Sequence, residues 1–290
     1  MRTELARRFR ALLSGSQTGI PDWTPLVAAG NDGGMFGPDD APWIVHADLA
    51  TLVGGIRALL VQAMHPGSLA GVVQHSRYEE DVLGRLNGTI RWLTICTFGS
   101  SEAIAAESER VNAMHARVRG SYNDNSGERV HYGASHPHLL AWVHLAFTDS
   151  FLTTHQLFGQ KLVDGDAYVA GWANAVRPLG LLDAPTSVAA MRDVISAFDA
   201  ELRVDDTTRR VVAFIKRVPF PRGAKPAYWL LFQAAVASLP ESYRRQLGLS
   251  TLPRPLVLFA TRRVLRVMRW ILGDRSPMED AALSRRALHA

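Results

Sequence analysis

The sequence predicts an all-α protein, a single globular domain of about ten helices over residues 1–290. Three observations carry this prediction. Apolar residues recur at helical spacing in long segments, most clearly over 100–120 and 135–155. Prolines fall in the gaps between such segments, where helices are expected to end. Strand-like alternation of apolar and polar residues is rare, and no internal repeat is present.

Length and composition are those of a globular protein with a sizeable core. Of 290 residues, 47% are hydrophobic and 20% are charged, and no flexible linker divides the chain. The net charge is +5, but the arginines gather near the two ends, so we expect no nucleic-acid partner. The single cysteine, Cys96, excludes a disulfide framework and a thiolate zinc cluster. Without a secretory signal or an uncharged apolar run of about 18 residues, we expect a cytoplasmic protein.

The first half of the chain is expected to begin with a helix and a connector. Residues 1–13 mix arginines with apolar residues, which predicts an amphipathic helix that lies on the protein body or on a lipid surface. Residues 15–42 are rich in Gly, Pro and Asp and predict an irregular connector. Residues 43–64 predict a buried helix that is interrupted at His65-Pro66-Gly67, and 85–98 predict another that ends at Gly99.

Two long helices with a polar loop between them form the centre of the prediction. Ser100 or Ser101 caps the first, which carries His115 on its apolar face and stops at Gly120. Ser135 caps the second, with Pro137 in its first turn. Around His144 in this helix, the residues one or two turns away are nearly all apolar: Leu140, Ala141, Phe147, Thr148 and Phe151. We therefore expect the His144 ring to be buried and the two helices to face each other.

The second half of the chain continues in helices. They are predicted over 164–176, 186–202, 205–217, 224–239 and 253–272. In the last of these, three arginines share one face and four apolar residues lie against it: Arg262, Arg266 and Arg269, with Val257, Val264, Val267 and Ile271. This pattern suits a helix packed on the domain with a solvated arginine face, and also contact with a membrane surface.

Common catalytic motifs are absent. The sequence contains no Gly-x-Gly-x-x-Gly, no Walker loop, no Gly-x-Ser-x-Gly and no His-Glu-x-x-His, and the two Glu-x-x-His pairs of a di-iron bundle are missing. Nine of the ten histidines lie between His46 and His155. A histidine in an apolar pocket is a common axial ligand of haem, and non-covalent haem needs no tight sequence motif.

Four segments together resemble a known family. They are HPGSLAGVVQHS from His65, TFGSSEA from Thr97, RVNAMHARVRG from Arg110 and HPHLLAWVHLAFTDSFL from His136. In order and spacing they are similar to the bacterial MpaB-like oxygenases, which share a catalytic domain with rubber oxygenases. The likeness covers 43–182, and more loosely the helices that follow. On this basis we divide the domain into an N-terminal part (1–42), a haem-binding core (43–182) and C-terminal helices (183–290).

The resemblance implies a non-covalent haem b whose iron is held by His144, on the helix after the polar loop. It implies a distal arginine, which Arg110 matches. The lysine and threonine that follow in rubber oxygenases are replaced by Ala113 and Met114, so rubber cleavage itself is not expected. His115 is then the nearest polar residue on the distal side.

The resulting hypothesis is a haem-dependent oxygenase that acts with dioxygen on an apolar or small organic substrate, with Arg110 and His115 as catalytic residues. His65 matches a further histidine of the family and is included among the cofactor-binding residues. Two other hypotheses stay open: a haem carrier or sensor without turnover, and a peripheral membrane protein without a cofactor. The sequence does not fix the oligomeric state.

Each site residue also has a structural interpretation. His144 and His115 suit hydrogen-bonded core residues, and Arg110 suits an ion pair with Glu107. The His65 ring suits a bond to a carbonyl left free by the helix break at Pro66. The other histidines are expected to be solvated or to cap helices: His46, His75, His131, His136, His138 and His155.

Overall fold

A central pair of helices organises the molecule. In the computed structural model, which describes residues 4, 6–7, 10–11, 19–75, 82–273 and 275–289, α8 (Pro137–Phe158) packs along α4 (Thr51–Gln62). Gly54 permits this close approach, because a Cβ there would lie 2.6 Å from the Phe151 ring. The ion pair between Arg57 and Asp149, 2.7 Å long, joins the same two helices.

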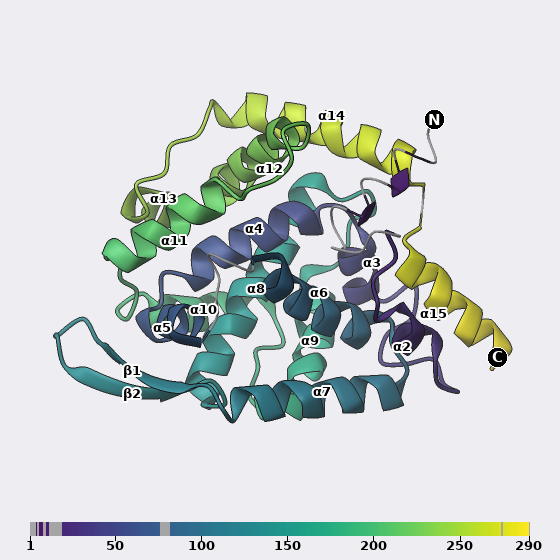
Figure 1. The fold of residues 1–290 in the computed structure, drawn as a ribbon, viewed down its shortest axis with the longest axis horizontal. Coiled ribbons are helices and arrows are strands. Elements are labelled where there is room, and N and C mark those ends of the chain that lie inside the picture. The colour runs from purple at the N-terminus through teal and green to yellow at the C-terminus, as the bar shows by residue number, and fades with distance from the viewer. Residues whose placement is uncertain are drawn as a thin grey trace.

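The remaining helices surround this pair. Figure 1 shows α14 and α12 along one edge of the molecule, α7 along the opposite edge and the hairpin at one corner. From the edge inward, α14 packs on α12, α12 packs on α4, and α4 packs on α8. The bounds are α2 (Thr24–Ala28), α3 (Ala41–Ala47), α5 (Pro66–His75), α6 (Val82–Phe98), α7 (Ser101–His115), α9 (Gly165–Val176), η1 (Arg177–Leu179), α10 (Val188–Phe198), α11 (Asp206–Lys216), α12 (Lys225–Ser238), α13 (Glu241–Gln246), α14 (Arg254–Leu272) and α15 (Pro277–Leu288). The all-α prediction is confirmed.

The polar loop between the central helices is a small antiparallel hairpin, which was not predicted. β1 (Arg119–Asn123) pairs with β2 (Arg129–Gly133), and the turn uses Gly127 at φ +86°. Arg203 donates to the carbonyls of Asn123 and Asp124, which ties the hairpin tip to the segment after α10. The hairpin packs on α5.

Several helix ends differ from the prediction. Ser100 does cap α7, because its hydroxyl accepts the Ala103 amide. However, α7 ends at His115, and Gly120 lies in β1 instead of stopping the helix. The residue that caps α8 is His136, not Ser135. The apolar segment 43–64 is two helices, because the Asp48 carboxylate accepts the Ala50 amide in the break between α3 and α4.

The C-terminal helix α15 closes the fold, and no helix was predicted there. Ser276 and Glu279 form a capping box at its start. The buried Arg285 then donates to the carbonyls of Val27, Asp32 and Phe98. These contacts fasten the end of the chain to α2, to the loop after it and to the end of α6.

The described residues contain no single helix that is long and apolar enough to cross a membrane, and only α3 and α4 together meet that test, across a 95° bend. Most of the amphipathic helix predicted over 1–13 lies outside the described residues.

Candidate functional site: a buried histidine on the central helix

His144 lies inside the molecule, on the central helix α8. Its side chain is buried, and its Nδ1 atom has no hydrogen-bond partner among the described residues. Its Nε2 atom lies 3.5 Å from the Thr148 hydroxyl, which is a long contact, and that hydroxyl donates to the His144 carbonyl at 2.7 Å. Burial lowers the pKa of His144 to about 4. At neutral pH the ring is therefore uncharged, with a nitrogen lone pair available.

The residues one and two turns from His144 on α8 indicate what lies beside this face of the helix. One turn before His144, Leu140 belongs to a small apolar cluster with Val176 and Leu181, and Ala141 and Trp92 of α6 pack against this cluster. Two turns after it, the Phe151 ring contacts the His46 ring of α3 at 5.4 Å. His144 lies between these positions on the same face of α8, the face that meets this cluster and His46 of α3.

Arg110 is engaged in an ion pair. Its guanidinium donates to both carboxylate oxygens of Glu107, at 2.9 and 2.6 Å, and Arg91 donates to the same carboxylate at 2.9 Å. The Glu107 side chain is buried, whereas that of Arg110 is 38% exposed. The hydrogen bond that Arg110 donates to the Glu107 carboxylate raises the pKa of Arg110. The pairing anticipated as the structural alternative is thus present, and a distal role for Arg110 stays a prediction.

His115 is the last residue of α7. It is half-buried, its Nδ1 atom has no partner among the described residues, and burial lowers its pKa. The expectation that its helix faces α8 is not met, because α7 packs mainly on α6 and η1 while α8 packs mainly on α4. His115 and His144 are therefore not brought together across a shared helix interface.

His65 caps the start of α5. Its Nδ1 atom accepts the backbone amides of Gly67 and Ser68, at 3.1 and 3.3 Å. The prediction of a bond from the ring to a free carbonyl is therefore wrong, because the Nδ1 atom accepts hydrogen bonds from the first amides of the next helix. Burial lowers the pKa of His65, and the neighbouring Glu201 opposes that shift.

His65 also belongs to a cluster with a metal-binding composition. Its Nε2 atom, the His138 Nε2 atom and a Glu201 carboxylate oxygen lie within 4.8 Å of one another. Two histidines and a carboxylate are a common iron ligand set. However, amides can only donate, so Nδ1 of His65 must keep its lone pair and Nε2 must carry the proton. That proton points to Glu201 at 3.1 Å, and His138 binds the same carboxylate at 2.8 Å. The cluster is hydrogen-bonded as it stands and does not offer His65 as a ligand.

Two other histidines were wrongly expected to be solvated or capping. His46 is buried, with its two ring nitrogens bonded to Thr97 at 2.8 Å and Tyr168 at 3.0 Å. His155 is buried, and its Nε2 atom donates to the Lys161 carbonyl at 2.7 Å. The prediction holds for His136, which caps α8.

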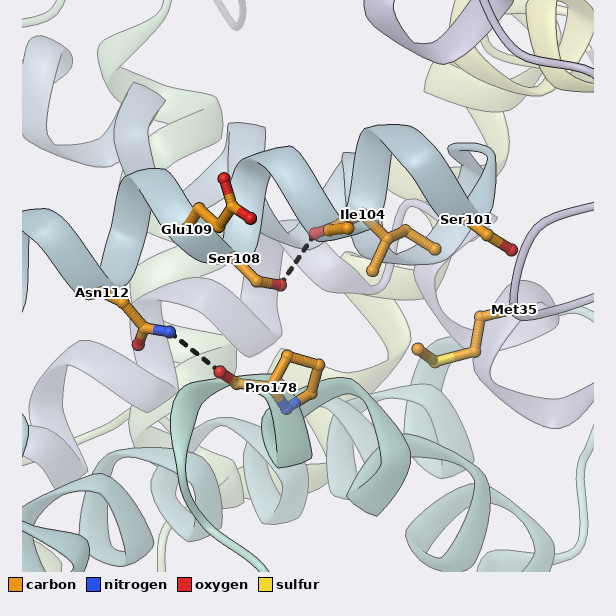
Figure 2. Close-up of a pocket in the computed structure, with 8 residues that line it drawn as sticks. Met35, Ser101, Ile104, Ser108, Glu109, Asn112 and Pro178 are labelled. Atoms are coloured by element: carbon orange, nitrogen blue, oxygen red, sulfur yellow. Dashed lines mark hydrogen bonds between the residues drawn. The ribbon is translucent and has the colours of Figure 1, made fainter.

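Two surface grooves lined by described residues do not include His144 among their lining residues. The first, of about 450 Å³, runs along α7 beside η1, and Figure 2 shows Ser108 and Asn112 of α7 across from Pro178 and Met35. The second, of about 640 Å³, lies at the hairpin and is lined by Arg119, Arg129 and His131, among others. The second groove is basic, and its arginines already bond Ala116 and Ser121.

The residues at His144 fit a haem in one respect that the structure shows directly. A buried, neutral imidazole without a close partner is what an axial iron ligand requires. The indole nitrogen of Trp92, on the α6 side, is also buried without a partner among the described residues. Sequence reasoning did not single out Trp92, because a tryptophan in an apolar helix usually signals only the core.

Comparison with known proteins identifies the family of the chain. The family model described as "ER-bound oxygenase mpaB/B'/Rubber oxygenase, catalytic domain" matches residues 43–270, which include α3 through most of α14. No curated protein and no solved structure gives a match. Because the family model covers well over half of the 290 residues, the chain belongs to the mpaB and rubber oxygenase catalytic-domain family.

Proposed function

We propose that this chain is a haem b-dependent oxygenase that acts with dioxygen on an apolar small molecule, with His144 as the axial iron ligand. The observation that carries the proposal is the state of that side chain, which is buried, uncharged and without a close partner. Leaving a buried polar atom unpaired costs about 1–3 kcal/mol. Such a cost is typical of a site built to bind something.

The protein's part in this reaction is binding and exclusion of water. The α8 helix holds the His144 ring inside the molecule, on a helix face that also carries the buried apolar residues Leu140 and Phe151. A bound haem would supply the activation of dioxygen, and the protein would tune it through the ligand and the surrounding dielectric. Trp92 offers a hydrogen-bond donor from α6.

A contact between Arg110 and bound dioxygen depends on the ion pair that Arg110 forms. In the described arrangement its guanidinium is occupied by Glu107, so a contact with bound dioxygen requires that pair to open. Arg91 would then keep the Glu107 carboxylate paired. His115, at the end of the same helix, keeps its unpartnered Nδ1 atom as a second donor or acceptor.

The haem claim is tested by the visible spectrum of protein expressed with haem supplied. We expect a Soret band in the wild type and its loss in His144→Leu. The matched control is His131→Leu, an exposed histidine on β2, which should keep the band. Because His144→Leu removes an unpaired polar atom from an apolar site, its free energy of unfolding without haem should match or exceed that of the wild type.

These results separate ligation from folding. A His144→Leu protein that folds and still shows an unchanged Soret band would place the ligand elsewhere. A colourless wild type that ignores added hemin would remove the haem from the proposal. Oxygen uptake with apolar substrates then distinguishes an oxygenase from a haem carrier, since only the oxygenase consumes oxygen in proportion to the substrate added.

A further inference from the structure

The outer face of α14 is unusual because large apolar side chains lie exposed on it. The helix packs inward through a stripe at helical spacing, formed by Val257, Thr261, Leu265 and Met268. Its outward side exposes a second set, each more than half accessible to solvent: Leu256, Phe259, Val267 and Trp270. A solvated arginine face alone, which is one of the two alternatives that the sequence left open, does not describe this surface.

The same face is strongly positive. Residues Arg254–Leu272 include five arginines and no acidic residue. Arg269 forms an ion pair with the carboxylate of Asp48, at 2.7 Å, and Arg262 donates to the Leu157 carbonyl. Arg263 and Arg266 are exposed, and Arg263 lies 5.0 Å above the Phe259 ring. Charge and apolar surface are therefore interleaved along one side of the helix.

We propose that this side of α14 binds the surface of an anionic lipid bilayer. We call it the α14 face, and it is formed by Leu256, Phe259, Arg263, Arg266, Val267 and Trp270. With a rise of about 1.5 Å per residue, it extends about 21 Å along the helix. An interfacial helix combines arginines, which meet lipid phosphates, with Trp, Phe and Leu, which enter the boundary of the acyl chains.

The composition of the α14 face favours a lipid surface over other partners. A second copy of the chain, seated face to face, would bring Arg263 and Arg266 against their own counterparts, which repel. Nucleic acid would use the arginines but would leave Leu256 and Val267 in water. A bilayer with anionic headgroups satisfies both kinds of side chain.

The inference does not depend on the proposed haem chemistry. α14 packs on α12 (Figure 1) and on α8, and its described hydrogen bonds to α8 are with Leu157 and Phe158 at the end of that helix, more than three turns beyond His144. Loss of haem binding would therefore leave the membrane proposal standing, and loss of membrane binding would leave the haem proposal standing.

The test is flotation of the purified full-length chain with lipid vesicles. We expect the protein to float with vesicles of phosphatidylcholine and phosphatidylglycerol at low salt, and to stay below with phosphatidylcholine alone. Raising the salt should weaken binding by screening the charges. The double variant Arg263→Glu/Arg266→Glu and the double variant Phe259→Ser/Trp270→Ser should each reduce partitioning roughly tenfold or more.

A matched control separates the α14 face from surface changes in general. Leu182→Ser/Arg192→Glu removes one exposed apolar residue and one exposed arginine elsewhere on the molecule, and it should float like the wild type. Circular dichroism of each variant checks that it is folded. Equal flotation of all variants, or none by the wild type, overturns the proposal, as does a wild type that dimerises through α14 or binds DNA but not vesicles.

A second measurement places the helix at the lipid. Brominated lipids quench tryptophans that enter the bilayer, so vesicles that contain them should dim the wild-type fluorescence. Trp270→Phe should remove most of that quenching. Trp229→Phe removes a partly exposed tryptophan of α12 and should leave the quenching in place. The reverse pattern would assign the contact to another face.

Discussion

At the scale of single residues, the useful distinction is between buried histidines that are satisfied and those that are not. His46 and His144 are both buried in the same core. His46 has both ring nitrogens bonded, to Thr97 and Tyr168, and needs no further explanation than packing. Neither ring nitrogen of His144 has a hydrogen bond of comparable length. The sequence pattern around the two rings does not separate them, because both lie in apolar helices.

The burial of His46 predicts that the free energy of unfolding depends on pH. Burial lowers its pKa to about 3 from an unfolded value near 6.5. Between these values the unfolded chain binds a proton that the folded chain does not, so stability should fall as the pH drops from about 6.5 toward 3. At pH 4.5, His46 should cost about 2–3 kcal/mol relative to pH 8. Urea unfolding at both pH values measures this cost.

The matched variant is His46→Gln, which cannot take up the proton. Its free energy of unfolding should fall less between pH 8 and pH 4.5 than that of the wild type, by about the amount given above. Any loss of packing in the variant should show equally at both pH values. An identical fall in the two proteins would mean that His46 is not buried in its neutral form.

At the scale of the elements, the α4–α8 pair depends on a charge that the apolar sequence pattern hides. The Arg57 side chain is nearly inaccessible, and it bonds Asp149 and Ser150 of α8, both at 2.7 Å. Asp149→Asn would leave the guanidinium charge buried without its counter-ion. We expect a loss of about 3 kcal/mol in the free energy of unfolding, read from denaturant midpoints.

The control for this variant is Glu241→Gln in α13. It removes the carboxylate of an exposed pair with Arg245, in which both side chains are largely accessible. Its effect should stay within about 0.5 kcal/mol. Equal effects of the two substitutions would show that the contact between α4 and α8 does not rely on the ion pair.

Local signals in the sequence were sufficient for most elements. The cap at Ser100, the proline in the first turn of α8 and the periodicity of α9 and α14 each correspond to a described helix. The hairpin was missed because its strands are short and pair mainly with each other. The end of α7 was placed five residues late, because the chain leaves the helix at His115 to begin β1 while apolar residues still continue the pattern.

At the scale of the whole molecule, contacts between distant segments could not be predicted. Glu201 reaches His65 and His138 only because the end of α10 lies beside the starts of α5 and α8. The buried contacts of Arg285 could not be predicted either, because an arginine in a basic, polar segment is usually solvated. For the candidate site, the burial of His144 and the pairing of Arg110 with Glu107 followed from their neighbours in the sequence. The second arginine on the Glu107 carboxylate, Arg91, needed the fold.

Arg285 gives the prediction at this scale. Replacing it with methionine keeps the length of the side chain but removes every donor to the carbonyls of Val27, Asp32 and Phe98. Buried carbonyls without partners cost about 1–3 kcal/mol each. We therefore expect faster hydrogen exchange of the amides in α15 and α2. Arg192→Met, on the exposed side of α10, should leave both helices protected, and equal protection in Arg285→Met would contradict this role.

The position of Arg285 also has a consequence for biosynthesis. The carbonyls that it binds belong to segments translated before it, and Arg285 follows them in the chain by 187 to 258 residues. Until α15 has emerged from the ribosome, α2 and the end of α6 lack this clamp. A stalled chain that ends before α15 is therefore expected to be more sensitive to protease than a chain that includes it.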